Sequence, residues 1–165
     1  MGVQTGGPSS LGFRAVFQEP EACSLQPLNQ VPSEQSGRVH ICVLFTEMQE
    51  TLAALRSAEG LSAGLSANIT LIVPLTVPYP LALESPPVSL GFLCRRIRQM
   101  ASSVAMEIEA YVYLCRDPLK TLEEALHPRS IVVIGTRWGG FFDKSHRMAR
   151  KLRRRGHHVV LSKCR

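Results

Sequence analysis

The chain has 165 residues, of which 45% are hydrophobic, and its net charge is +6. This length fits one domain with an appended tail, and the hydrophobic share is enough for a proper core. No apolar run approaches the roughly 20 residues that a membrane span needs, and no basic start followed by an apolar segment marks a secretory signal. We therefore expect a cytoplasmic protein without a membrane partner.

The five cysteines are odd in number and widely spaced along the chain. They are Cys23, Cys42, Cys94, Cys115 and Cys164. The sequence contains no Cys-x-x-Cys pair and no Cys/His pair at zinc-finger spacing. This pattern predicts reduced thiols, which are usual in the cytoplasm.

Residues 1–37 are rich in Gly, Pro, Ser and Gln, and their apolar residues follow no period. Such a segment buries too little surface to offset its ordering entropy, so we expect a disordered N-terminal tail. An alternative is an upstream extension that the native protein lacks. Within it, only Leu11–Phe17 is a candidate for local docking. The folded domain is expected to span residues 38–165.

The first elements of this domain are two apolar strands that flank a helix. Val39–Phe45 and Ile69–Pro74 are continuous apolar runs, which are typical of strands covered on both faces. Thr46 and Gln49 have the spacing of a capping box, which predicts a helix start between the two strands. Apolar residues at helical spacing continue this helix. They are Met48, Leu52 and Leu55.

A second helix and a strand follow a Pro-rich loop. Ser89 can cap a helix whose apolar positions recur every three to four residues. These positions are Leu90, Leu93, Ile97, Met100 and Val104. Glu107–Leu114 alternates apolar and polar residues, which predicts a half-exposed strand at the edge of a sheet.

The C-terminal part repeats the same alternation. Asp117 and Pro118 have the N-cap and first-turn chemistry of a short helix. Ser130–Ile134 is a buried-strand run, residues 143–155 form a basic helix, and Val159–Leu161 is a fifth strand. Strict alternation of buried strands and amphipathic helices predicts an α/β fold with a parallel sheet. In such sheets, ligands bind beyond the carboxyl ends of the strands.

The stretch Arg129–Gly140, followed by a helix and by His158–Ser162, resembles the C-terminal strand, glycine loop, helix and strand of the universal stress protein family. The resemblance covers about residues 38–165. It implies a three-layer sandwich whose five parallel strands have the order 3-2-1-4-5, a fold of the adenine-nucleotide-alpha-hydrolase-like or flavodoxin-like type. It also implies a homodimer that pairs through the last strand. The dimer edge would then comprise His158, Val159, Val160 and Leu161.

Nucleotide-binding members of that family carry a glycine pattern after the fourth strand. Gly135 matches its first glycine, but Trp138 stands where the second is expected, and glycine follows one residue late. Residues 141–165 contain no Gly-Ser or Gly-Thr, and Thr46-Glu47 replaces the aspartate that the family tends to place after its first strand. We therefore expect weak or lost ATP binding and a binding or regulatory function without catalysis.

An alternative is a site for ATP, another adenine nucleotide or a phosphometabolite with a modified phosphate loop. Its candidate residues for nucleotide or anion binding are Thr46, Glu47, Gly135, Thr136, Arg137, Trp138, Gly139, Gly140, Ser145 and Arg147. Arg can pair with phosphate, and Trp can stack on a ring. The competing interpretation is a surface loop in which Trp138 packs against a neighbouring Phe.

The basic charge is concentrated near the C-terminus, where residues 143–165 hold nine Lys/Arg and one Asp. A further alternative is therefore binding of an anionic polymer through the helix at Lys144–Arg155. We do not expect nucleic acid, because the run has no interleaved aromatic residue and no nucleic-acid motif occurs. His157 and His158 are adjacent in a strand and point to opposite faces, so we expect no metal site.

Overall fold

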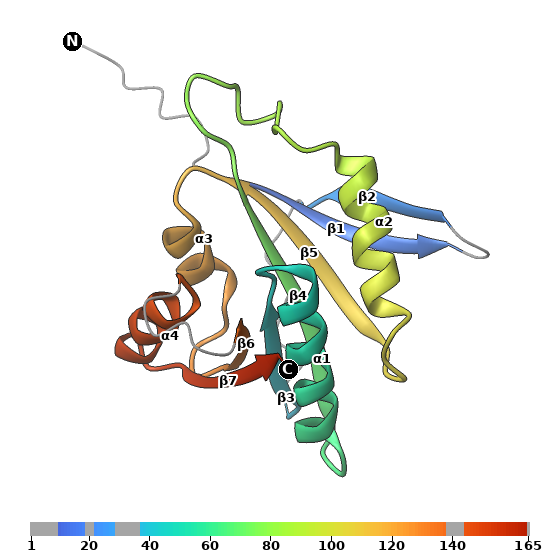
Figure 1. The fold of residues 1–165 in the computed structure, drawn as a ribbon, viewed down its shortest axis with the longest axis vertical. Helices are drawn as coiled ribbons and strands as arrows, with labels where there is room; N and C mark the ends of the chain where they lie inside the picture. The colour runs from blue at the N-terminus through green and yellow to red at the C-terminus, as the bar shows by residue number, and fades with distance from the viewer. Residues whose placement is uncertain (1–9, 19–21, 29–36, 138–143, 165) are drawn as a thin grey trace.

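The structure is a computed structural model that describes residues 10–18, 22–28, 37–137 and 144–164. Within them, one mixed sheet of seven strands is covered by four helices (Figure 1). The strands are β1 (Ser10–Gln18), β2 (Ala22–Pro27), β3 (Val39–Leu44), β4 (Ala67–Thr76), β5 (Ile108–Cys115), β6 (Ile131–Arg137) and β7 (His158–Cys164). The helices are α1 (Met48–Ser62), α2 (Leu90–Ala101), α3 (Pro118–Ala125) and α4 (Lys144–Arg154). None of the described helices has the length and apolar character needed to cross a bilayer.

The five strands from β3 to β7 form a continuous parallel sheet in the order β5-β4-β3-β6-β7. This arrangement confirms the predicted parallel strands and their order 3-2-1-4-5. The reason lies in the strand sequences, since Ile41–Leu44 and Leu71–Val73 are buried throughout. Strands that are apolar on both faces require cover on both sides, which the crossover helices provide.

A hairpin of β1 and β2 extends the sheet beyond the predicted five strands. β1 pairs antiparallel with both β2 and β5. The prediction of a disordered tail is therefore wrong for residues 10–18 and 22–27, while residues 1–9, 19–21 and 29–36 lie outside the described part. Phe13 and Phe17 pack against the main core. Because β1 pairs with the side of β5 that does not face β4, the prediction that Glu107–Leu114 is an edge strand is also wrong.

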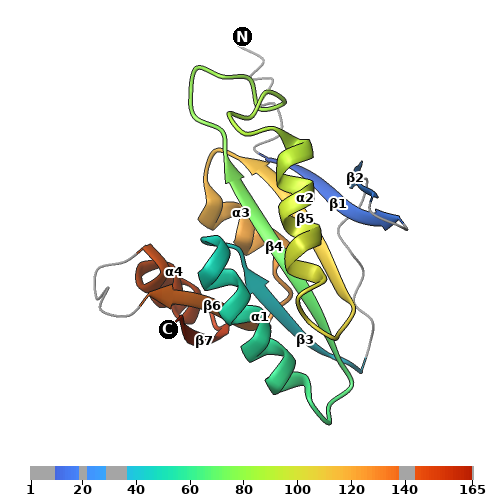
Figure 2. The ribbon, with the colours of Figure 1, turned by 45° about the vertical axis from the view of Figure 1, so that its right-hand side comes forward.

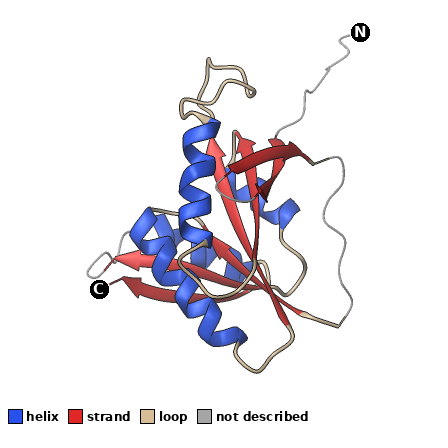
Figure 3. Cartoon of the chain, turned by 90° about the vertical axis from the view of Figure 1, so that its right-hand side faces the viewer, coloured by secondary structure: helices blue, strands red, loops and turns tan. Residues whose placement is uncertain are grey.

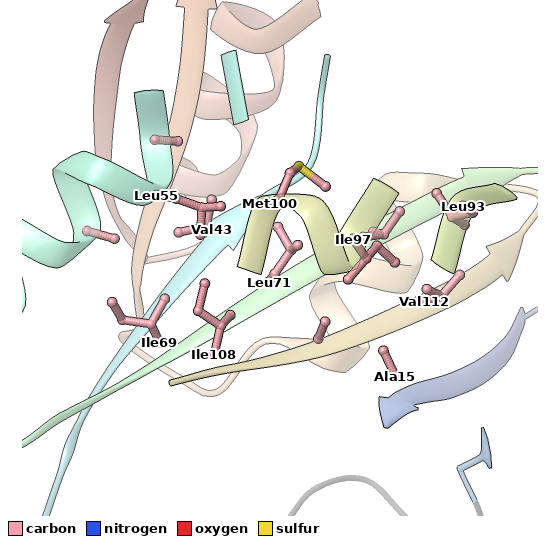
Figure 4. Packing of buried hydrophobic residues seen from close by; sticks show 14 of the residues in the cluster. Ala15, Val43, Leu55, Ile69, Leu71, Leu93, Ile97, Met100, Ile108 and Val112 are labelled. Atoms are coloured by element: carbon pink, nitrogen blue, oxygen red, sulfur yellow. The ribbon is translucent and has the colours of Figure 1, made fainter. Parts of the chain in front are cut away.

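Helices α1 and α2 cover one face of the sheet (Figure 3). Their buried side chains interlock with those of β3, β4 and β5, as Figure 4 shows for Leu55, Leu71 and Ile97. Each of these three residues is at most 1% exposed. Burial of a large aliphatic side chain contributes about 1.5–3 kcal/mol, so this cluster supplies much of the stability.

Helices α3 and α4 cover the opposite face, over β3, β6 and the adjoining strands (Figure 2). Leu122 of α3 and Leu152 of α4 are fully buried there, together with Val132 and Ile134 of β6. The expected placement of helices on both faces is therefore confirmed.

The helix starts follow the predicted capping chemistry in two of three cases. The Ser89 hydroxyl accepts a hydrogen bond from the Phe92 backbone N–H at 3.5 Å, and Asp117 accepts from the first turn of α3. The predicted capping box of α1 is wrong. Its N-cap is Glu47, whose side chain makes no capping hydrogen bond. The Thr46 N–H donates to the Thr51 hydroxyl, and this hydroxyl donates to the Glu47 carbonyl.

A disulfide joins Cys23 of β2 to Cys94 of α2, with Cα atoms 5.9 Å apart. The prediction of reduced thiols is therefore wrong for these two residues. Cys42 and Cys115 are buried thiols in strands, as expected of core residues. The disulfide links the β1–β2 hairpin to α2. Strands β1 and β2 are therefore attached to the parallel sheet both by backbone pairing and by a covalent bond.

Candidate functional site

The candidate site is a cleft at the carboxyl ends of β3 and β4, bordered by the starts of α1 and α4. β3 has β4 on one side and β6 on the other, so the strand order reverses at this point. The cleft has a volume of about 360 Å³. Its walls are formed by Leu44, Phe45, Thr46, Glu47, Glu50, Pro74, Lys144, Ser145 and Met148. This size lies in the range of small-molecule sites.

Gly135 lies within β6 and is buried beneath the first turn of α1. The backbone of Glu50 occupies the space where any side chain at position 135 would stand. The glycine therefore lets a helix approach a strand closely. In the family that the sequence resembles, the glycine at this position would instead leave room for phosphate.

Arg137 ends β6 and forms ion pairs with two glutamates of the α1 start. Its guanidinium contacts the Glu47 carboxylate, and its Nε lies 3.3 Å from Oε1 of Glu50. The Glu50 side chain is 6% exposed, whereas that of Arg137 is 67% exposed. Glu47 and Glu50 also line the cleft, together with the cation Lys144. The two carboxylates are thus balanced by Arg137 and Lys144.

The hydroxyl groups of the predicted site have different surroundings. Thr46 and Ser145 both line the cleft, and the Oγ1 atom of Thr46 is buried without a hydrogen-bond partner in the described part of the chain. Thr136 is buried within β6 and is not among the cleft residues. The Thr46 hydroxyl is therefore a buried polar atom of the cleft wall that the described residues leave unsatisfied.

The remaining predicted residues do not join this cluster. Arg147 is exposed on α4 and does not line the cleft. Trp138, Gly139 and Gly140 lie outside the described residues. The sequence analysis missed Glu50 and its contact with Arg137. The available signal was the spacing of Glu47 and Glu50, which places both carboxylates on one face of the first helical turn.

The predicted dimer edge lies at one end of the sheet, where β7 has β6 as its neighbour. Val159 and Leu161 pack towards the cluster beneath α4, while His158 and Val160 are exposed. Val160 is 36% exposed, and it is one of a few large apolar side chains with such exposure. A strand edge of this kind is open to pairing with another strand.

The described cysteines and histidines form no metal centre, and the buried thiols are poor nucleophiles. His157 Nδ1 lies 3.1 Å from the Ser130 hydroxyl. Burial raises the pKa of the Cys42 thiol to about 12, so it is protonated at neutral pH. Burial also raises the pKa of Cys115 and lowers that of His157. Across the described ranges, no group of three or more His, Cys, Asp and Glu side chains is arranged to hold a metal ion.

Neither a protein-family model nor a curated protein sequence matches the chain. The functional assignment therefore depends on the geometry of the cleft and of the sheet edge.

Proposed function

We propose that the chain is a homodimeric binding module of the universal-stress-protein type, whose cleft takes a small neutral ligand in preference to ATP. The observation that carries this proposal is the ion pairing of Arg137 with Glu47 and Glu50. This arginine is one of the two, with Arg147, that the sequence suggested for phosphate recognition. Two carboxylates already pair with it, so it is not available to pair with a phosphate.

The surroundings of Gly135 support the same conclusion. Phosphate groups bind where backbone N–H groups converge at a helix N-terminus and glycines allow close approach. Gly135 is instead covered by α1, so it offers no open surface to a phosphate. Gly135 therefore provides no phosphate contact, and we assign no ATP-dependent step to the described part of the chain.

The remaining cleft favours a neutral ligand with a flat apolar part. Phe45, Pro74 and Met148 contribute apolar walls, and Thr46 contributes a buried hydroxyl without a described partner. Such a combination of apolar surface with one or two polar groups is typical of small-molecule sites. A ligand hydroxyl or amide that bonds Thr46 would satisfy that atom, which contributes about 1 kcal/mol.

A thermal-shift series with adenosine, AMP, ADP and ATP tests the cleft. We expect the midpoint of unfolding to rise less with each added phosphate, and ATP to give no rise at millimolar concentration. Glu47→Gln removes one carboxylate from Arg137 and should increase stabilisation by ATP. Glu84→Gln, an exposed glutamate in the loop before α2, is the matched control. Stronger stabilisation by ATP than by adenosine in the native protein would overturn the proposal.

The homodimer would form by antiparallel pairing of β7 with β7 of a second copy. Light scattering between 1 and about 200 μM should show a dimer, and Val160→Lys should shift it to a monomer because like charges would face each other across the axis. Val39→Lys changes a side chain of similar exposure on β3, away from the edge, and should leave the assembly intact. A native protein that is monomeric throughout this range contradicts the dimer.

A nucleotide or phosphometabolite site is the second candidate. It is favoured by Lys144 and by the first turn of α4, which both border the cleft, because a helix N-terminus and a lysine attract anions. The same ligand series separates the two functions. This candidate predicts that stabilisation grows from adenosine to ATP and that Lys144→Gln removes the gain.

A further inference from the structure

Four cations lie on one stripe of α4. Arg147, Arg150, Lys151 and Arg154 are all exposed, and at 100° per residue they fall within about 100° of the helix circumference. The opposite side of the helix carries Ala149 and Leu152, which are at most 1% exposed and pack on the sheet. Because the apolar side is fully used for packing, the basic stripe faces solvent.

These four cations form no ion pair or hydrogen bond with any described residue. Their neighbours in sequence do. Arg153 donates to the Val159 carbonyl at 3.1 Å, and Arg155 pairs with Glu123 at 3.0 Å. The sequence alone could not separate engaged from unengaged cations. Among the described residues, the structure therefore reveals a basic stripe without the carboxylate partners that a purely structural role would provide.

The sequence of this helix carries no nucleic-acid motif, and from the sequence alone we do not expect nucleic acid. From the unpaired stripe, we propose that it docks the sugar-phosphate backbone of double-stranded DNA without reading its sequence. Three of the four residues are arginines, whose planar forks match phosphate oxygens in pairs. The stripe carries no Asn or Gln that would read adenine and no apolar side chain that would contact the thymine methyl group.

The shape of α4 favours DNA over an anionic membrane. The helix lies at the periphery of the molecule, on the side away from the β1–β2 hairpin (Figures 1 and 2). A helix is about 10–12 Å across, and the major groove of B-DNA is about 12 Å wide. A membrane-surface helix needs an apolar face to insert, and the apolar face of α4 is buried against the sheet. This inference does not depend on the ligand of the cleft or on the dimer.

Fluorescence anisotropy with a labelled 20-base-pair duplex tests the proposal through its salt dependence. Four phosphate contacts predict that log K falls with log salt with a slope of about −3.6 per protomer, since each contact contributes about −0.9. Arg150→Gln/Lys151→Gln should reduce the slope to about −1.8 and weaken binding on the order of 50-fold at 0.1 M salt. The matched control is Arg56→Gln/Arg95→Gln, which removes two exposed cations from α1 and α2. It should leave both quantities unchanged.

Three outcomes would overturn the proposal. In the first, the control variant lowers the salt slope and the affinity for the duplex as much as Arg150→Gln/Lys151→Gln does, which would indicate a general charge effect. In the second, the protein binds poly-glutamate as tightly as it binds the duplex, which would indicate an acidic protein partner. The last is binding to phosphatidylserine vesicles in the absence of DNA binding. Circular dichroism of both variants verifies that they fold, which is expected because all four substituted side chains are exposed.

Discussion

A Cβ atom placed on Gly135 would lie 1.9 Å from the carbonyl oxygen of Glu50. Real side chains do not come this close to backbone, so Gly135→Ala must push α1 away from β6. We expect the free energy of unfolding to fall by about 2 kcal/mol or more, because overpacking of a filled interior typically costs 1–3 kcal/mol. Urea denaturation measures it.

The matched control for this substitution is Gly60→Ala in α1. A Cβ at Gly60 would have no atom within 4 Å, and alanine is favoured over glycine in a helix by about 0.5–1 kcal/mol. Gly60→Ala should therefore stabilise the protein slightly. Equal effects of the two substitutions would mean that α1 does not rest on Gly135.

The Cys23–Cys94 disulfide should stabilise the folded chain. The two residues are 71 positions apart, and a closed loop of this length restricts the unfolded chain strongly. We expect Cys23→Ser/Cys94→Ser to lower the free energy of unfolding by about 2–4 kcal/mol. Adding a reductant to the native protein should have the same effect, and it should change nothing in the double variant.

Stability should depend on pH through His157. Burial lowers its pKa below the usual value of about 6.5, so the unfolded chain binds a proton before the folded chain does. The contribution of neutral His157 to the free energy of unfolding is fully present above pH 6.5. It is lost as the pH falls from 6.5 through the pKa of His157 in the folded chain. His157→Gln should flatten this part of the stability profile. An unchanged slope in the variant would place the effect elsewhere.

Native alkylation should distinguish the three cysteines outside the disulfide. The pKa of Cys42 is about 12, and burial also raises that of Cys115, so neither forms much thiolate at pH 8. Cys164 is only half-buried in β7. Iodoacetamide at pH 8 should therefore label Cys164 first, and peptide mass spectrometry would show it. Early labelling of Cys42 would mean that β3 opens readily.

The parallel part of the fold could be predicted from sequence because each of its elements carries its own local signal. Strand β3 is an uninterrupted apolar run, and α2 combines a Ser89 cap with an apolar stripe. The β1–β2 hairpin carries no such local signal in its sequence. β1 alternates only loosely within a Gly- and Ser-rich segment, and it becomes stable by pairing with β5, which is distant in sequence.

Three of the predicted site residues, Thr46, Glu47 and Ser145, lie together along one cleft. The state of Arg137 could not be predicted. Its partner Glu47 lies 90 residues away in the sequence, and the pair forms because α1 rests directly on β6. Whether an arginine is available to a ligand depends on such distant neighbours, which residue patterns do not specify.

The covalent link between β2 and α2 also changes what a break in the backbone would do. The Pro-rich loop between β4 and α2 lies inside the ring that the Cys23–Cys94 bond closes. A protease that cuts this loop once would leave both pieces joined as a single species. Only reduction would then release two fragments, so a nicked protein would keep its mass, apart from one added water, until its sulfur bridge is opened.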